Sequence, residues 1–187
     1  AAEFNRVLPM FMTAAGKINP ANVLVVGAGV AGLQAIATAK RLGAIVYGTD
    51  VRSASKEQVE SLGGKFVMVE DKESKDAETS GGYAKEMSAE YQKKQEALLA
   101  DTLKNIDIII CTAQIPGRKA PLVIKKYMIE NMKPGSVIVD LAVESGGNCE
   151  YSQVGKIVNK NSVKIVGHAN VPGRVASNAS SLFSKNI

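Results

Sequence analysis

Three glycines and one aspartate are the residues of this 187-residue sequence whose types and spacing could do chemistry. Gly27, Gly29 and Gly32 are spaced as G-x-G-x-x-G, and Asp50 follows further on. In a dinucleotide-binding turn, the first glycine makes the tight turn, the second lets a pyrophosphate approach the backbone, and the third lets a helix pack closely on a strand. An acid such as Asp50 accepts hydrogen bonds from the adenosine ribose. The open alternative is a tight turn with a helix-capping acid and no ligand.

The segments around these residues have the periodicities that such a site needs. Residues 23–26 are apolar and mostly β-branched, which is typical of a strand buried on both faces. Residues 31–42 are mostly good helix formers, and Gly43 ends that helix. Residues 44–49 form a second buried strand. The helix N-terminus between the two strands would offer N–H groups and the positive end of its dipole to phosphates.

The charge at the end of the second strand bears on the choice of cofactor. A 2′-phosphate beside Asp50 would meet a like charge, which favours NAD(H) over NADP(H). Arg52 argues the other way, because an arginine at this place can hold a 2′-phosphate. Asp50 comes first at the strand end, so we expect NAD(H).

The remaining pattern extends this unit into a doubly wound sheet. We expect an α/β fold with a mostly parallel Rossmann-type sheet, and helices on both faces, over residues 21–166. Ser55 and Gln58 have capping-box spacing at the start of a helix that runs to about Leu62. Further strands are expected at 65–69, 106–111 and 136–141, helices at 88–103 and 122–131, and a hairpin or edge pair at 156–159 and 163–166. A first helix at 4–15 and a linker would fill residues 1–20.

Composition narrows the function classes. No apolar run has the length of a membrane span. The net charge is +5, and no acidic residue follows Glu150. The basic residues of that last part are sparse and few aromatics lie among them, which argues against nucleic acid as a partner. A surface for an acidic partner and an ordinary solvated edge both remain open.

The sequence offers no convincing catalytic or metal-binding set. Cys111 and Cys149 are too few for a disulfide framework and fit no metal motif. His168 is the only histidine; a general base is conceivable, but a structural role is favoured because no carboxylate lies near it in sequence. Asp140 and Glu144 fit loop and capping roles better than acid/base or metal roles. We therefore predict no catalytic residue and no metal.

Residues 70–82 are polar and contain no large apolar side chain. Gly81 and Gly82 would form a hinge, and Tyr83 and Met87 would give the segment an apolar surface with which to close. A functional flap and a mobile surface loop are the two interpretations.

With these segments assigned, the sequence resembles the proton-translocating nicotinamide nucleotide transhydrogenases, and within them the second Rossmann subdomain of the NAD(H)-binding domain I. The glycine fingerprint itself is shared with alanine dehydrogenases. The more specific motifs are Pro9-Met-Phe-Met-Thr-Ala-Ala-Gly16, Asp50-Val-Arg52, Gly82-Tyr-Ala-Lys-Glu-Met87, Val139-Asp-Leu-Ala-Val-Glu-Ser-Gly-Gly-Asn-Cys-Glu150 and Gly167-His-Ala-Asn-Val-Pro172.

The resemblance implies further cofactor-binding positions. Matched by position, those near the pyrophosphate and adenosine ribose are Val30, Asp50, Val51 and Arg52. A loop that closes on the nucleotide is matched by Gly82 and Tyr83. Gln95 matches a position near the cofactor, and Gln114 stands where the family often has leucine.

The resemblance also implies an activity and partners. NADH held on this domain would pass a hydride directly to NADP⁺ on a separate domain III, coupled to proton movement through a membrane domain II. The amino-terminal subdomain of domain I is missing here, and residues 167–187 resemble the return segment toward it, so the chain alone is expected to be inactive. A homodimer is expected, as is a soluble domain of an enzyme in an organelle inner membrane or bacterial plasma membrane. The alternatives are an NAD-binding domain of an alanine dehydrogenase-like amino-acid dehydrogenase and a module that senses NAD(H) without turnover.

Overall fold

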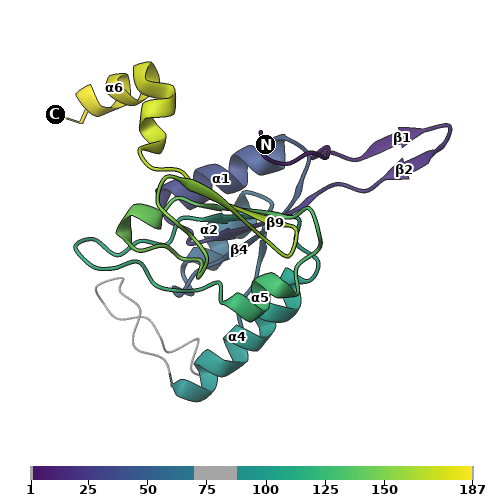
Figure 1. Cartoon of the computed structure of the whole chain (residues 1–187), viewed down its shortest axis with the longest axis horizontal. Helices are drawn as coiled ribbons and strands as arrows, with labels where there is room; N and C mark the ends of the chain where they lie inside the picture. The colour runs from purple at the N-terminus through teal and green to yellow at the C-terminus, as the bar shows by residue number, and fades with distance from the viewer. Residues whose placement is uncertain (1, 70–87, 187) are drawn as a thin grey trace.

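The computed structural model describes residues 2–69 and 88–186, and its centre is a sheet of seven strands (Figure 1). The strand order is β5-β4-β3-β6-β7-β9-β8, and every neighbouring pair is parallel except β9 and β8. The strands are β3 (Asn22–Val26), β4 (Ile45–Thr49), β5 (Lys65–Phe66), β6 (Ile108–Cys111), β7 (Val137–Asp140), β8 (Lys156–Lys160) and β9 (Val163–Gly167). The predicted doubly wound, mostly parallel sheet is confirmed.

Helices cover both faces of this sheet, which has one apolar core on each side. The helices are α1 (Val30–Arg41), α2 (Ser55–Ser61), α4 (Ala89–Leu103), α5 (Lys126–Glu130) and α6 (Ala176–Ser184). Successive residues of β3 point to opposite faces. Val25 shares a core with Ile36 of α1, whereas Leu24 shares the other core with Leu103 of α4. Each such fully buried side chain contributes about 1.5–3 kcal/mol to stability.

The register of the strands brings three chain segments to one edge. Val26, the last residue of β3, pairs with Thr49 on one side and with Cys111 on the other. The chain continues from β3 to β4 and β5 in one direction along the sheet, and β6 begins the other direction. This reversal is the place where ligands bind in open α/β sheets. The glycine turn and Asp50 therefore lie at the expected edge.

The predicted first helix is wrong. Residues Phe11–Thr13 and Gly16–Ile18 form the antiparallel hairpin β1–β2, a separate two-stranded sheet that projects from the body (Figure 1). Pro9 lacks a backbone N–H for a helix that continues past it. Gly16 has a φ of 133°, and the Thr13 hydroxyl donates to the Gly16 carbonyl at 3.3 Å, so this local chemistry makes a turn. Of the apolar side chains predicted for the helix, Phe4 is buried in a core instead.

Three local boundaries also differ from prediction. The residue before α2 is Ala54, whose side chain makes no cap, and Ser55 is buried inside the helix, so the capping box is wrong. Strand β5 has only two residues. Residues 122–125 stay outside α5 because the N–H groups of Val123 and Ile124 both donate to the Asn148 carbonyl.

The carboxyl half follows its pattern more closely. Strands β8 and β9 pair antiparallel, as expected for a hairpin. The tail forms the short helix η2 (Val171–Val175) and then α6, which stands away from the sheet and has no buried residue (Figure 1).

Asn148 anchors the loop that leaves β6. Its side chain is fully buried; Oδ1 accepts from the Ala113 N–H at 3.1 Å, and Nδ2 donates to the Ala113 and Pro121 carbonyls, each at 2.8 Å. The buried Asp140 in turn accepts from the Asn148 N–H at 2.9 Å. Asp140 and Asn148 thus fix the sheet edge through structural hydrogen bonds, which agrees with the loop role favoured for Asp140.

We expect Asn148→Ala to lower the free energy of unfolding by roughly 2–4 kcal/mol, because it leaves three buried backbone groups without a partner. Chemical denaturation measures the change. Asn159→Ala, at an exposed position of β8, is the matched control and should change stability by less than about 0.5 kcal/mol. Equal stability of the two variants would contradict the anchoring role.

Candidate functional site

Each glycine of the fingerprint meets a different steric demand. Gly27 has a φ of +93°, and a Cβ there would lie 2.8 Å from the Ala113 nitrogen. A Cβ on Gly32 would lie 1.8 Å from the Gly27 carbonyl oxygen, which is impossible without moving the helix. A Cβ on Gly29 would meet nothing within 4 Å. The tight turn and the close packing of helix on strand are therefore built in, and the space beside Gly29 is open.

The N-terminus of α1 faces that open space. Gly29 is its capping residue and offers no side chain, and the first turn contains no acid. Val30 follows and is 90% exposed. The first N–H groups of a helix have no partner within the helix, and the dipole there is positive. The arrangement suits an anion such as a phosphate.

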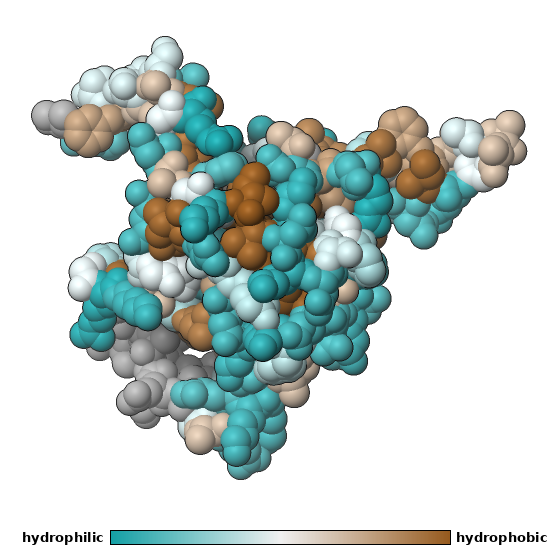
Figure 2. All heavy atoms as spheres, viewed as in Figure 1, coloured by the Kyte–Doolittle hydropathy of each residue, from teal (hydrophilic) through white to brown (hydrophobic). Residues whose placement is uncertain are grey.

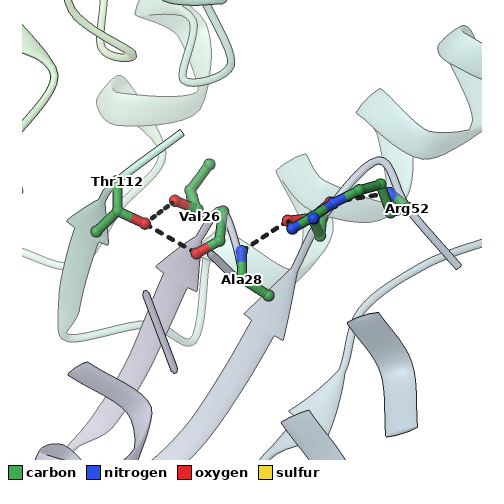
Figure 3. Close-up of polar contacts among 6 residues, drawn as sticks. Val26, Ala28, Arg52 and Thr112 are labelled. Carbon is green, nitrogen blue, oxygen red and sulfur yellow. Dashed lines mark hydrogen bonds and ion pairs between the residues drawn. The ribbon is translucent and has the colours of Figure 1, made fainter. Parts of the chain in front are cut away.

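Asp50 lies between this turn and its own following residues. Its Oδ2 accepts from the Ala28 N–H at 2.7 Å, and its Oδ1 accepts from the Arg52 N–H at 2.9 Å. The Arg52 guanidinium adds two bonds, Nε to Oδ1 at 3.0 Å and Nη2 to Oδ2 at 3.1 Å (Figure 3). The carboxylate is therefore linked to the glycine turn and forms a bidentate ion pair with Arg52.

The electrostatics keep this carboxylate ionised. Burial by itself would raise the pKa of Asp50, but the hydrogen bonds from Arg52 and Ala28 and the positive charge of Arg52 outweigh it, so the pKa lies below the usual value of an aspartate. The Asp50 side chain is 8% exposed and that of Arg52 is 42% exposed. Arg52 can therefore leave the pair without disturbing the core. Val51, between them, is 69% exposed and takes no part in the core.

Thr112 is a site residue that sequence reasoning missed. It follows β6 directly, and its Oγ1 lies 2.8 Å from the Gly27 carbonyl oxygen and 3.1 Å from that of Val26 (Figure 3). The one available sequence indication was its place just beyond a strand at the ligand-binding edge. Its partners lie 85 and 86 positions away, so only the fold reveals them.

Gln95 and Gln114 lie on either side of this centre. Gln95 of α4 accepts from the Val69 N–H at 2.8 Å and donates to the Val67 carbonyl at 3.3 Å, so it holds the chain that leaves β5. Gln114 is exposed, donates to the Leu141 carbonyl at 3.3 Å, and helps line a hollow with residues 115–119, Glu144 and Ser145. Gly82 and Tyr83 lie outside the described residues, as does the predicted flap.

Other candidate groups have structural surroundings. His168 is half-buried, with its Nδ1 3.3 Å from the Arg174 guanidinium. Cys111 and Cys149 are buried free thiols, and burial raises the pKa of Cys111 well above its usual value. Within residues 2–69 and 88–186, no group of three or more histidine, cysteine, aspartate or glutamate side chains could hold a metal ion. In the same residues, no helix is long and apolar enough to span a membrane.

The sheet order, the glycine turn and the acid at the end of β4 define a Rossmann-type α/β domain. The particular family follows from comparison with known proteins. The chain belongs to the family described as the alanine dehydrogenase/PNT C-terminal domain, whose model matches residues 1–187.

Several relatives and a solved structure are similar to the chain. The first of the polypeptides that make up the NAD(P) transhydrogenase alpha subunit of Rhodospirillum rubrum is 65% identical over all of this chain and 49% of its own length. A crystal structure of transhydrogenase from Sinorhizobium meliloti has a TM-score of 0.88 and 54% identity, covering 100% of this chain and 49% of that one. An alanine dehydrogenase of Mycobacterium tuberculosis is 32% identical over 73% of this chain and 31% of its own length. The chain spans about half the length of the transhydrogenase subunit relative.

The two outer glycines of the fingerprint's helix end, Gly29 and Gly32, give opposite expectations for alanine. Gly32→Ala should lower the free energy of unfolding by roughly 3 kcal/mol or more, because the new methyl group overlaps a backbone oxygen. Gly29→Ala should lower it by about 1 kcal/mol or less, because alanine is a poorer helix cap but enters open space. Thermal and denaturant unfolding of the two variants measure the difference. Similar losses in both would contradict the close approach of α1 to β3.

Proposed function

We propose that this chain is the NAD(H)-binding part of a proton-translocating transhydrogenase. The observation that carries the proposal is the open space beside Gly29, with the N-terminus of α1 facing it and Asp50 at the end of β4. The similarity of the whole chain to a transhydrogenase subunit supports the same assignment. The pyrophosphate lies over Gly29, and the adenosine ribose lies at Asp50.

Ribose binding requires a rearrangement that the hydrogen bonds define. A carboxylate has about four lone-pair sites. In this structure Asp50 uses two for backbone N–H groups and two for the Arg52 guanidinium. The ribose hydroxyls therefore replace the guanidinium, which moves aside into solvent, and the bonds to Ala28 and Arg52 backbone nitrogens remain.

The same charges favour NADH over NADPH. A 2′-phosphate would lie against the ionised Asp50, which stays anionic because its pKa is lowered. Arg52 offsets part of this repulsion only when it leaves Asp50, and that separation costs the bidentate ion pair. The pair thus makes the positive charge less available to a 2′-phosphate.

The role of this chain in the reaction is binding and orientation. When bound, NADH supplies the hydride, which passes directly to NADP⁺ on a separate domain III. Such a transfer needs two nicotinamide rings held face to face and no acid/base side chain. Val30, Val51, Gln95 and Gln114, together with Gly82 and Tyr83, are proposed to complete the cofactor site.

The proposed partners are domain III, the membrane domain II and an amino-terminal subdomain of domain I. In this proposal the chain is the soluble part of an enzyme in an organelle inner membrane or bacterial plasma membrane. The exposed apolar residues Leu182 and Phe183 of α6 support a neighbouring unit that packs on the tail. Residues 167–187 are the return segment toward that unit.

An amino-acid dehydrogenase of the alanine dehydrogenase type is the second candidate, because the family model covers both kinds of protein. The lower identity to an alanine dehydrogenase makes it the weaker one. Hydride exchange between NADH and NADP⁺ after addition of domain III supports the first candidate. Oxidation of NADH that depends on pyruvate and ammonia supports the second. Binding of NADH with neither activity supports a sensing module.

Titration of the protein with NADH and NADPH, followed by nicotinamide fluorescence, tests the cofactor assignment. The sequence has no tryptophan, so background emission is low. We expect NADH to bind at least about tenfold more tightly, and Asp50→Ala to weaken NADH roughly tenfold or more, as expected for lost hydrogen bonds to a charged group. Arg52→Ala is the control and should bind NADH no more weakly than the wild type. Equal or tighter binding of NADPH would overturn the assignment.

We also propose that two copies pair through the β1–β2 hairpin. Its apolar side chains Met10, Phe11, Met12 and Ile18 are exposed, with Met12 at 75%, and hydrophobic surface extends along this arm (Figure 2). An isolated two-stranded hairpin is marginally stable in water, so a covering surface would stabilise it.

A double substitution, Phe11→Ser with Met12→Ser, should convert a dimer to a monomer, because it removes the apolar surface of the arm. Sedimentation velocity at several protein concentrations measures the change. The control is Val154→Ser with Ile157→Ser, which removes exposed apolar side chains elsewhere and should leave the dimer intact. A wild type that sediments as a monomer at all concentrations would refute the pairing.

A further inference from the structure

The peptide group that joins Gly27 to Ala28 is held at both ends. Its carbonyl oxygen lies 2.8 Å from the Thr112 hydroxyl, and its N–H donates to Asp50 at 2.7 Å (Figure 3). A trans peptide is planar, with its C=O and N–H pointing in opposite directions. Two side chains from the strand ends on either side of β3 therefore fix the rotation of one peptide plane.

The Thr112 contact has no substitute among the described residues. Of the hydrogen bonds found in residues 2–69 and 88–186, only that of Thr112 reaches the Gly27 carbonyl oxygen. That oxygen is also the atom against which Gly32 packs. Thr112 is itself half-buried, and its backbone N–H donates to the Val26 carbonyl at 2.8 Å, which fixes the position of its side chain.

The orientation of this plane decides where the next backbone groups point. Gly29 and Val30 follow directly, and their N–H groups are the ones that the start of α1 presents to the open space. Rotation of the 27–28 peptide would turn the φ/ψ pair that precedes them. A phosphate site made of backbone N–H groups works only when those groups converge on one point.

We propose that Thr112 is a positioning residue of the dinucleotide site: by holding the Gly27 carbonyl opposite Asp50, it aims the N–H groups at the start of α1 toward the pyrophosphate. This role rests on the proposed binding of a dinucleotide. Thr112 does not touch the ligand. Its hydroxyl acts through the peptide plane, so its loss affects ligands that carry a pyrophosphate and spares those that reach only Asp50.

The test compares Thr112→Val, which removes the hydroxyl at nearly constant shape, with Thr112→Ser, which keeps it. Calorimetric titrations of the full-length protein with ADP-ribose, NADH and adenosine measure the affinities. We expect Thr112→Val to weaken ADP-ribose and NADH about tenfold, the size of one lost hydrogen bond. Adenosine should change less than about twofold, and Thr112→Ser should stay within about twofold of the wild type for all three ligands.

Hydrogen–deuterium exchange of a peptide that spans residues 26–33 provides a readout without ligand. Faster exchange in Thr112→Val and wild-type exchange in Thr112→Ser are the expected results. Unchanged exchange with unchanged ADP-ribose affinity in Thr112→Val overturns the positioning role. Equal weakening of adenosine and ADP-ribose also overturns it, because that result describes a general loss of structure. Failure of the wild type to bind any of the ligands refutes the proposed function instead, while the exchange comparison still decides whether Thr112 holds the turn.

Discussion

The close approach of α1 to β3 is the constraint on which the rest of this structure depends. A single hydrogen atom at Gly32 allows the helix to start directly above the Gly27 carbonyl, where a methyl group would overlap that oxygen. The helix axis then points its N-terminus at the edge where β3, β4 and β6 end together. The strand register, the open space at Gly29 and the position of Asp50 all follow from this contact. The site is thus a consequence of packing at the point where the sheet reverses its direction.

Electrostatics add a second layer to this geometry. The Asp50 carboxylate satisfies a backbone N–H of the turn while it neutralises Arg52, so one acid serves both the fold and the specificity of the site. Burial opposes its charge, and the surrounding donors overcome that opposition. The exposed Arg52 is the component that ligand binding can displace at little cost to the core. In the proposed function, the same pair selects against a second phosphate on the ribose.

The edge beyond β6 shows how buried amides and hydroxyls support a loop that carries no regular structure. Asn148 binds both backbone groups of Ala113, and Asp140 binds the backbone of Asn148, so residues distant in the chain become rigid neighbours. Thr112 lies at the start of the same loop and reaches back to the glycine turn. The hollow lined by Gln114 opens next to these fixed groups. The hairpin β1–β2 and helix α6, by contrast, have no such anchors and stay exposed.

The sequence by itself determined the βαβ unit, the glycine turn and the acid after β4, because these depend on local propensity, hydrophobic period and backbone conformations that glycine favours. It also predicted the β8–β9 pair, and its resemblance to the transhydrogenases named the right family. The first helix failed because apolar residues at 4–12 fit a helical period, while the hairpin depends on the Thr13–Gly16 turn and on Phe4 packing in the core. The capping box failed because Ser55 is buried against the fold. Only the tertiary structure decided that Thr112 and Asp50 hold one peptide plane, since partners 85 and 22 residues apart meet through sheet register and leave no trace in local pattern.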